Sequence, residues 1–346
     1  MIIRPIPQEE RERYDEVVHH PLQSWAWGEF RRVQGQEVER LGVFDDNGNL
    51  IEGLQVTFHS IPVLGGTVGY LPKGTQPNAY HFPALRDIGK KHNAVFIKLE
   101  PNVMYPAGSQ NYFNDTLKLL EENNARPGQA LFTPYTFTLD LTPDPETIFE
   151  NCKSKTRYNI RLARKKGVEI VEDTSEQGME DYLRLLKETT DRQGFYAHDE
   201  TYFRTMWEHL GKSQSKMFRI LKAVYEGKVI TAWIIFIHNG VGYYPYGASS
   251  RDHRDVMANN LVMWEALMLA KREGCTSFDM WGALGPEPDP NHKWHGFHRF
   301  KEGYGATLMQ SLGTYDLILD FPKYSLFTIA NKLRWGLLRL KARFIK

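Results

Sequence analysis

Alternating apolar and polar residues predict two series of β-strands, one in each half of the chain. In the first half this pattern covers residues 38–44, 50–59, 67–71, 94–100 and 132–141. An Asn47-Gly48 pair joins the first two of these strands and predicts a hairpin turn. In the second half the pattern covers residues 168–172, 217–225, 229–238, 241–246, 276–281 and 313–319.

Apolar residues at helical spacing predict helices between these strands. The predicted helices cover residues 8–18, 24–34, 84–91, 110–124, 150–166, 180–193, 201–210, 260–273 and 325–343. The last helix has an apolar stripe formed by Leu326, Ile329, Ala330, Leu333, Leu337, Leu340 and Phe344. We expect this stripe to pack against the first domain, while the basic face of the helix is a candidate for contact with phospholipid head groups.

A heptapeptide that repeats half a chain later indicates a duplicated domain. Residues 68–74 read Val-Gly-Tyr-Leu-Pro-Lys-Gly, and residues 241–247 read Val-Gly-Tyr-Tyr-Pro-Tyr-Gly. Strands precede both copies, and a helix and a further strand follow both. This order resembles the fold of the GNAT-type N-acyltransferases, so the predicted class is α/β (α+β), with two duplicated acyltransferase-like domains and a cleft between them. The predicted units are 1–142, 146–319 and a C-terminal helix, 320–346, that packs back on the first unit.

Composition and length narrow the class of protein further. The 346 residues fit two domains, and the share of apolar residues is that of an ordinary globular protein. Cys152 and Cys275 offer neither a disulfide framework nor a metal-ligand spacing, and the chain has no apolar run suited to a signal core or a membrane span. We therefore expect a cytoplasmic protein without a metal or an organic cofactor.

Positive charge is concentrated in two segments although the net charge is only +1. Residues 153–166 and 323–346 each contain seven lysines and arginines and no acidic residue. Such segments are typical of contact with a polyanion, for example RNA, a nucleotide-linked substrate or an anionic membrane at the inner face of the plasma membrane. A solvated helix face explains either segment equally well.

The segments that would bind coenzyme A in an acyltransferase contain no glycine. The pyrophosphate of that cofactor binds where a glycine-rich turn opens a helix, because bare amides meet the anion there. The corresponding residues are 76–83 in the first copy and 249–259 in the second, and neither segment has a glycine. This disfavours acyl-CoA and predicts another acyl donor.

Five short motifs follow one another in segments 23–30, 155–168, 246–249, 278–282 and 300–305. The first reads Gln-Ser-Trp-Ala-Trp-Gly-Glu-Phe, and the last reads Phe-Lys-Glu-Gly-Tyr-Gly. Together they resemble the FemABX family of peptidoglycan-bridge aminoacyltransferases. Members of that family move an amino acid from aminoacyl-tRNA to a stem-peptide amine of a peptidoglycan precursor. Many of them carry a coiled-coil arm, for which the segment between Leu210 and Phe218 is too short.

The resemblance implies a role for three catalytic candidates. Lys301, in the last motif, would stabilise the oxyanion of the tetrahedral intermediate, and the alternative is a surface lysine after a strand. Glu100 and Asp279, on corresponding strands of the two copies, are candidates to accept the proton that the attacking amine loses. The alternatives are substrate orientation for Glu100, and for Asp279 a partner that holds the turn at Gly282.

The resemblance also implies binding residues for both substrates. Arg31 falls where the family places a basic residue against the diphosphate of the precursor, and the alternative is an exposed helical arginine. The full set of expected substrate-binding residues is Trp27, Arg31, Lys73, His198, Tyr202, Tyr244, Tyr246 and Phe300. Arg157, Arg161 and Arg164 are candidates for contact with tRNA, with a solvated helix face as the alternative.

The predicted function is therefore aminoacyl transfer from aminoacyl-tRNA to a UDP-MurNAc-pentapeptide or a lipid-linked peptidoglycan precursor. Two alternatives stay open at this point. One is an acyl-CoA-dependent N-acyltransferase, and the other is a non-catalytic binding protein of the cell envelope.

Overall fold

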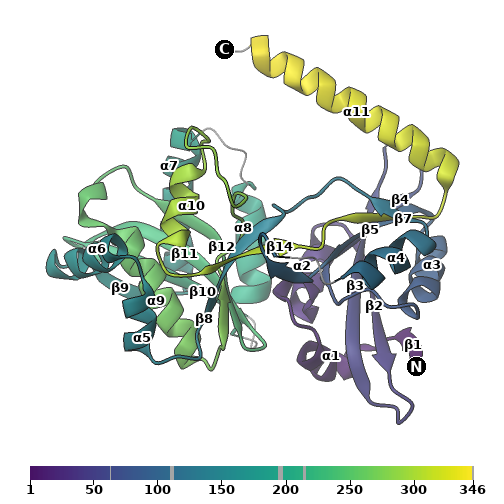
Figure 1. Ribbon diagram of the computed structural model, residues 1–346, viewed down its shortest axis with the longest axis horizontal. Helices are drawn as coiled ribbons and strands as arrows, with labels where there is room; N and C mark the ends of the chain where they lie inside the picture. Colours follow the sequence, from purple (N-terminus) through teal and green to yellow (C-terminus); the bar gives the residue numbers. More distant parts are fainter. Residues whose placement is uncertain (63, 110–112, 194–197, 213–215, 345–346) are drawn as a thin grey trace.

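The computed structural model describes residues 1–62, 64–109, 113–193, 198–212 and 216–344. Two mixed β-sheets form the centres of two lobes, and helices pack on both sheets (Figure 1).

The first lobe contains a seven-stranded sheet. Its strands, in spatial order, are β1 (Ile2–Pro5), β2 (Glu37–Phe44), β3 (Leu50–Ser60), β4 (Thr67–Gly74), β5 (Ala94–Pro101), β15 (Tyr315–Ile318) and β7 (Ala125–Pro127). Only β4 and β5 run parallel to each other. The helical segments of this lobe are η1 (Gln8–Glu10), α1 (Arg11–Val17), η2 (Pro21–Gln23), α2 (Trp25–Val33), α3 (His81–Lys91) and α4 (Asn114–Glu122).

The second lobe contains an eight-stranded sheet. Its strands, in spatial order, are β6 (Met104–Pro106), β14 (Thr307–Ser311), β8 (Tyr135–Asp140), β13 (Ser277–Asp279), β12 (Val241–Ser249), β11 (Lys228–His238), β10 (Phe218–Tyr225) and β9 (Glu169–Glu172). The parallel pair is β12 with β13, which corresponds to β4 with β5 in the first lobe. The helical segments are α5 (Pro145–Asn151), α6 (Ser154–Lys165), α7 (Glu176–Gln193), α8 (Glu200–Met206), η3 (Trp207–Gly211), η4 (Arg254–Val256), α9 (Ala258–Arg272) and α10 (His295–Glu302).

Strands are exchanged between the two halves of the chain. β8 lies between β13 and β14 in the second sheet, although the sequence analysis placed this segment in the first domain. β15 lies between β5 and β7 in the first sheet, although the sequence analysis placed it in the second domain. The partner of a strand depends on where the chain crosses between lobes, and no local pattern of residues records that. A boundary at residues 142–146 therefore does not separate the two sheets.

Helix α2 belongs to the first half of the chain but packs against the second lobe. Trp27 and Phe30 lie in the same apolar cluster as Tyr202 of α8. The Tyr243 hydroxyl on β12 also donates a hydrogen bond to the main-chain oxygen of His19, at 2.9 Å. Through these contacts, residues from the first half of the chain pack beside β12 and α8 of the second lobe.

The C-terminal helix α11 (Phe321–Phe344) contacts the first sheet only near its start and then extends away from it (Figure 1). Tyr324 and Phe327 each lie 5.2 Å from Phe96 of β5, ring centre to ring centre. Up to Leu333, the part of this helix whose side chains are described, the exposed large apolar residues are Phe321, Leu326, Ile329 and Leu333. The stripe that was expected to pack is thus exposed at these described positions, because the helix meets the sheet through its other face. No described helix is both long and apolar enough to cross a membrane.

Three described helices differ from the sequence-based expectation. Helix α5 is separate from α6, whereas one helix over residues 150–166 was expected, because Asp144 caps α5 and Pro145 takes its first position, where proline is favoured. Helix α4 begins at Asn114, and residues 110–112 of the expected helix lie outside the described part of the chain. Helix α10 was not expected, because Gly296 and the preceding loop with several prolines and glycines lack a helical pattern. This helix carries Lys301.

Candidate active site

A cavity of about 1390 Å³ lies where the two lobes meet. The first lobe contributes His20, just before η2, and the end of β4 to its wall, and the second lobe contributes β12, α10 and the turn after β13. The expected site residues that line it are Lys73, His198, Tyr244, Tyr246, Asp279, Phe300 and Lys301. The expected catalytic and substrate-binding residues outside the lining are Trp27, Arg31, Glu100 and Tyr202, and the three arginines expected to contact tRNA also lie outside it. The structure thus brings together seven of the predicted residues from both halves of the chain.

Lys301 is buried at the wall of this cavity, with only 1% of its surface exposed. Its Nζ donates hydrogen bonds to the main-chain oxygens of Trp281 and Gly282, the latter at 2.7 Å, and lies 3.8 Å from the centre of the Phe297 ring. Burial lowers the pKa of Lys301 well below its ordinary value, and the charge of Asp279 opposes this shift. Because an ammonium group has three N–H donors, one remains for a ligand after the two carbonyls are satisfied.

The turn after β13 is shaped to present these two carbonyls to Lys301. Trp281 has a left-handed backbone conformation, with φ of +56°, and Gly282 has φ of +35°. The carboxylate of Asp279 holds the turn by accepting hydrogen bonds from the Trp281 N–H, at 2.7 Å, and from the Thr136 hydroxyl. A left-handed conformation costs a bulky residue roughly 1–2 kcal/mol, and such strain is concentrated at functional sites. Asp279 therefore makes turn contacts and lines the cavity as well.

A β-bulge places Tyr244 beside Lys301. Two residues of β12, Tyr244 and Pro245, lie opposite one residue of β11, so the strand bends at this point. Pro245 has no N–H to give to the sheet and is therefore suited to a bulge. The Tyr244 ring stacks on Trp233 at 3.9 Å, and its centre lies 5.8 Å from the Lys301 Nζ. The aromatic wall shields the ammonium from bulk water.

Lys73 lies at the end of β4, on the cavity wall formed by the first lobe. Its φ of +51° is in the left-handed region, and its Nζ lies 5.1 Å from the centre of the Phe132 ring. Burial lowers the pKa of Lys73, and the charges of Asp279 and Glu100 oppose this shift. Tyr246, which occupies the same position in the second copy of the heptapeptide, also lines the cavity.

Glu100 lies behind the cavity wall rather than on it. Its carboxylate is buried and accepts hydrogen bonds from the Tyr70 hydroxyl, the Leu131 N–H and the Thr314 hydroxyl, the last two at 2.8 Å. Leu131 itself lines the cavity. Glu100 is therefore placed to hold that segment, and its catalytic role stays a prediction.

Arg31 lies on α2 among hydroxyl groups and imidazoles. It has no ion pair with any residue in the described ranges. Burial, with a smaller contribution from the charge of Arg31, lowers the pKa of His59 to about 4. The same two causes lower the pKa of His198. The rings of His198 and Tyr202 stack at 3.7 Å. Burial raises the pKa of Tyr202, and the hydrogen bonds of its hydroxyl with Tyr246 and Arg31 oppose this rise. The charge of the guanidinium is therefore not balanced by a carboxylate among the described residues and is available to an anion beside neutral donors.

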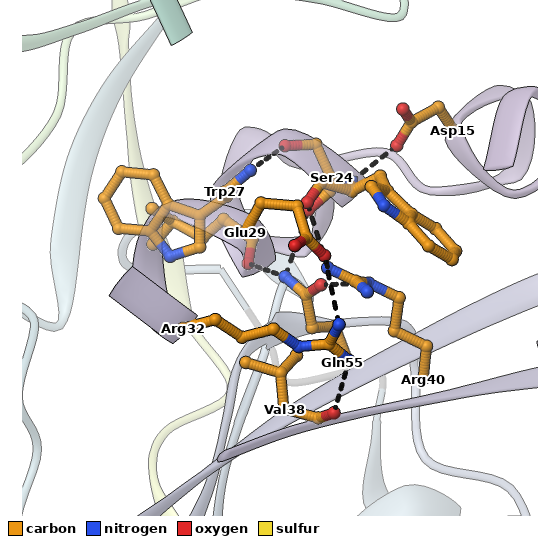
Figure 2. Close-up of polar contacts among 10 residues, drawn as sticks. Asp15, Ser24, Trp27, Glu29, Arg32, Val38, Arg40 and Gln55 are labelled. Carbon is orange, nitrogen blue, oxygen red and sulfur yellow. Dashed lines mark hydrogen bonds and ion pairs between the residues drawn. The ribbon is translucent and has the colours of Figure 1, made fainter. Parts of the chain in front are cut away.

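A polar network fixes α2, which carries Arg31, on the first sheet (Figure 2). The Ser24 hydroxyl caps the helix by accepting a hydrogen bond from the Trp27 N–H at 3.2 Å, and Arg40 Nε donates to Gln55 at 2.7 Å under the helix. A Cβ on Gly28 would lie 2.1 Å from the Gln55 side chain and 2.2 Å from that of Arg40. The glycine of the first motif is therefore needed for close packing, and Trp27 is a core residue.

The three arginines that were candidates for tRNA contact lie on α6, at the end of the second lobe far from the first (Figure 1). Arg157 donates hydrogen bonds to main-chain oxygens of the preceding helix and loop. Arg161 lies 5.1 Å from the centre of the Phe149 ring, and Arg164 pairs with Glu265 at 2.9 Å. Each side chain has a partner on its own lobe, and their contact with tRNA stays a prediction.

The sequence analysis missed several residues of the cavity lining, including Phe297 and His20. Phe297 precedes Lys301 by one helical turn, a spacing that indicates contact once α10 is known to be a helix. His20 lines the cavity three residues before the first motif, but a single histidine there gives no signal in the sequence.

The charge of the cavity favours an anionic ligand. Among the described residues of its lining, the cationic side chains are Lys73, Arg254, Lys293 and Lys301, and the only carboxylate is that of Asp279. The described residues of the whole chain contain no group of three His, Cys, Asp or Glu side chains placed to hold a metal ion.

Comparison with known proteins supports both the fold and the motifs. The sequence model of the FemAB family matches residues 6–222, and that of an acetyltransferase (GNAT) domain matches residues 151–294. The lipid II:glycine glycyltransferase of Staphylococcus epidermidis is 23% identical over 389 aligned residues, covering 90% of this chain and 91% of that protein. The enzyme of the same name from Staphylococcus aureus is 24% identical over 390 residues, with the same coverage.

Two solved structures share the arrangement of both lobes. The crystal structure of FemX superimposes with a TM-score of 0.82 at 20% identity, covering 94% of this chain and 99% of that chain. A tandem GNAT protein from the clavulanic acid biosynthesis pathway has a TM-score of 0.53 at 12% identity, covering 91% and 97% of the two chains. The predicted fold class, two GNAT-type units, is confirmed.

Proposed function

The chain belongs to the FemAB family, and from this membership we propose that it is an aminoacyltransferase that adds an amino acid to an amine of a peptidoglycan precursor. The donor in this proposal is aminoacyl-tRNA, and the acceptor is a UDP-MurNAc-pentapeptide or a lipid-linked equivalent. The name of the staphylococcal relatives, lipid II:glycine glycyltransferase, supports this acceptor class. The observation that carries the proposal is the Lys301 ammonium, buried at the cavity wall with one N–H donor unused.

The chemistry requires an oxyanion stabiliser at this position. The acceptor amine attacks the carbonyl carbon of the aminoacyl ester, a C–N bond forms, and the C–O bond to the ribose breaks. Negative charge develops on the carbonyl oxygen in the transition state, and a fixed cation in a dry site stabilises that charge more than it would in water. Lys301 has the burial and the free N–H that this role needs.

The proton of the attacking amine must move to the departing ribose oxygen. We propose Asp279 as the nearer candidate to relay it, because its carboxylate lines the cavity, while Glu100 acts through the segment at Leu131. The matched variants Asp279→Asn and Glu100→Gln separate the two roles. A relay predicts that Asp279→Asn flattens the pH dependence of kcat, whereas Glu100→Gln shifts KM and thermal stability with the same pH profile. The reverse pattern would make Glu100 the relay.

For the acceptor we propose that Arg31 binds the diphosphate. Arginine suits this contact because its planar fork gives two parallel hydrogen bonds to phosphate oxygens. His198, Tyr202 and Tyr246 are adjacent donors that remain neutral near pH 7. The role of Arg157, Arg161 and Arg164 in holding tRNA is also part of the proposal.

The test is incubation of the protein with charged total tRNA and each purified precursor, followed by mass analysis of the precursor. The expected result is a mass increment equal to one or more aminoacyl residues, which ribonuclease treatment abolishes and Lys301→Met reduces. Transfer from acetyl-CoA that survives ribonuclease would instead identify an acyl-CoA-dependent enzyme. If neither donor modifies any acceptor, the proposed activity is refuted.

We further propose that α11 contacts an anionic membrane surface near a lipid-linked acceptor. Leu326, Ile329 and Leu333 lie on one exposed face of the helix, and residues 323–346 carry seven basic residues and no acid. The test is cosedimentation with phosphatidylglycerol and with phosphatidylcholine vesicles. Binding should favour the anionic vesicles and be lost in a Leu326→Ser, Ile329→Ser variant but kept in Val171→Ser, which alters an exposed apolar residue of β9. Equal binding by both variants would contradict a role for α11.

A further inference from the structure

Two hydrogen-bond donors on the cavity wall of the first lobe lack an acceptor among the described residues. The ammonium of Lys73 has the Phe132 ring as its contact and makes no hydrogen bond or ion pair within that part of the chain. The imidazole of His20 accepts a hydrogen bond from the Leu22 N–H at its Nδ1, at 3.2 Å. Burial and the nearby Lys73 keep the pKa of His20 well below its usual range, so the ring is neutral and its proton lies on Nε2.

The backbone holds Lys73 in a costly conformation. Lys73 is the extra residue of a bulge between β4 and β5, and its φ of +51° costs a non-glycine residue roughly 1–2 kcal/mol. The carbonyls on both sides are fixed, since the Gln23 side chain donates to that of Pro72 at 2.6 Å and the Asn102 N–H donates to that of Gly74 at 2.7 Å. Strain that neighbouring groups maintain in this way indicates a functional constraint on the side chain.

The same glutamine fixes the position of His20. Gln23 ends η2, the short helix that His20 caps, and exchanges hydrogen bonds with the main chain of Gln55 at 2.7 and 3.1 Å. Lys73 and His20 are thus attached to one anchor between β3 and β4. Their relative position is set before any ligand binds, which is the arrangement expected of a binding site.

The carboxylates near this pair are bonded to other groups. Glu100 accepts three hydrogen bonds and Asp279 accepts two, and neither forms a hydrogen bond or ion pair with Lys73 within the described part of the chain. The lining as a whole has more cationic than anionic side chains. An external carboxylate would supply two oxygens, one for the ammonium and one for the imidazole N–H.

The location of the pair relates this carboxylate to the reacting amine. The His20 ring lies 5.6 Å from the ring of Trp281, whose main-chain oxygen accepts a hydrogen bond from Lys301, and Lys73 lines the same cavity as Lys301. The pair therefore lies near the proposed oxyanion site. Given the proposed function, on which this inference rests, the acceptor amine must lie beside Lys301. We propose that Lys73 and His20 bind a carboxylate of the acceptor peptide in the cavity that holds its reacting amine, and so select an acceptor that carries one.

Two groups of an acceptor could supply this carboxylate. One is a carboxylate on the amine-bearing carbon, as in diaminopimelate, which lysine lacks. The other is the C-terminal carboxylate of the stem peptide. The experiment compares precursors that have lysine or diaminopimelate at the amine-bearing position, each with a free or an amidated C-terminus, with one aminoacyl donor throughout.

The variants are Lys73→Met, Lys73→Arg and, as a matched control, Lys118→Met on the exposed surface of α4. The wild type should have a KM about 10–100-fold lower for acceptors with the recognised carboxylate, since a hydrogen bond to a charged group contributes about 1.5–3 kcal/mol. Lys73→Met should abolish this difference with a smaller change in kcat, Lys73→Arg should restore part of it, and Lys118→Met should retain it. If Lys73→Met removes the KM difference between lysine and diaminopimelate acceptors, the carboxylate is that of diaminopimelate. If it removes the KM difference between free and amidated C-termini, the carboxylate is that of the C-terminus.

Calorimetric binding of the acceptor without any donor tests the same proposal independently of turnover. Weaker binding by Lys73→Met, only for acceptors with the carboxylate, supports the site even if no transfer is observed. An equal loss for acceptors with and without carboxylates overturns the inference. A wild type that binds the carboxylate-bearing acceptor but transfers nothing would refute the proposed function and leave this site standing.

Discussion

The substitution Lys301→Met tests the proposed oxyanion stabiliser most directly. Methionine keeps most of the length of the side chain and removes the charge and all N–H donors. In the structure two of these donors are used by the carbonyls of Trp281 and Gly282, and the third is left for the acyl oxygen. Loss of one preorganised oxyanion donor typically lowers kcat by about 10²–10³-fold, or about 2.7–4 kcal/mol. Because the ammonium is 1% exposed, water cannot replace it, and we expect the upper part of that range.

The effect of Lys301→Met on stability has a defined pH dependence. Burial lowers the pKa of Lys301 in the folded protein below its ordinary value, 10.5. Between the lowered pKa and the ordinary one the unfolded chain binds this proton and the folded chain does not, so stability rises with pH across that window. The Lys301→Met variant has no ionisable group here and should not show this rise in stability. In denaturant unfolding at a series of pH values, the free energy of unfolding of the wild type should increase relative to that of the variant as the pH approaches 10.5.

Single-turnover transfer from saturating aminoacyl-tRNA is the assay for the rate. It measures the chemical step and not product release, and Lys118→Met serves as the control for loss of a lysine. Lys301→Arg keeps the charge but has a longer, planar head group, so we expect it to recover only part of the rate. A Lys301→Met rate within threefold of the wild type, in a folded protein that binds both substrates, would falsify the assignment of Lys301 as the oxyanion stabiliser.

Two further predictions concern the support of the site. Gly28→Ala should destabilise the protein by about 1–3 kcal/mol in denaturant unfolding, because the added Cβ would lie 2.1 Å from Gln55 and 2.2 Å from Arg40; an unchanged unfolding midpoint would show that the helix moves away at no cost. Lys98→Met leaves Asp316, its partner at 2.6 Å, buried without a cation and should cost about 3–5 kcal/mol. Burial already raises the pKa of Asp316, and loss of Lys98 raises it further, so the deficit should shrink as the pH falls; a pH-independent deficit contradicts this.

Local features of the sequence were sufficient to predict the repeated part of the fold. The heptapeptide at 68–74 and 241–247 gives β4 and β12, each followed by a helix and a parallel strand. These elements depend on periodicity and turns within a short stretch of chain. The exchange of β8 and β15 was not predictable, because their hydrogen-bond partners are decided by the packing of whole lobes.

In the candidate site, too, local motifs were predictable from the sequence, and contacts between distant segments were not. Lys301 was found from its motif, but its burial and its contact with Phe297 follow from α10, a helix that the sequence did not indicate. Glu100 was expected at the cavity because the family resemblance implies an acid at the end of this strand, yet its carboxylate accepts three hydrogen bonds behind the cavity wall. His20 gave no signal, since its role depends on Gln23 and on the distant bulge at Lys73.

The exchanged strands have a consequence for how the protein is made. β5 ends at Pro101, and its neighbour in the first sheet, β15, begins only at Tyr315. At about 5–20 residues per second, a ribosome needs on the order of 10–40 s to synthesise the intervening chain. During that time β5, whose residues are all buried in the finished fold, has a free edge that can pair with another nascent chain. Chains truncated before Ile318 should therefore depend on chaperones and aggregate, even though most of the first lobe has already been synthesised.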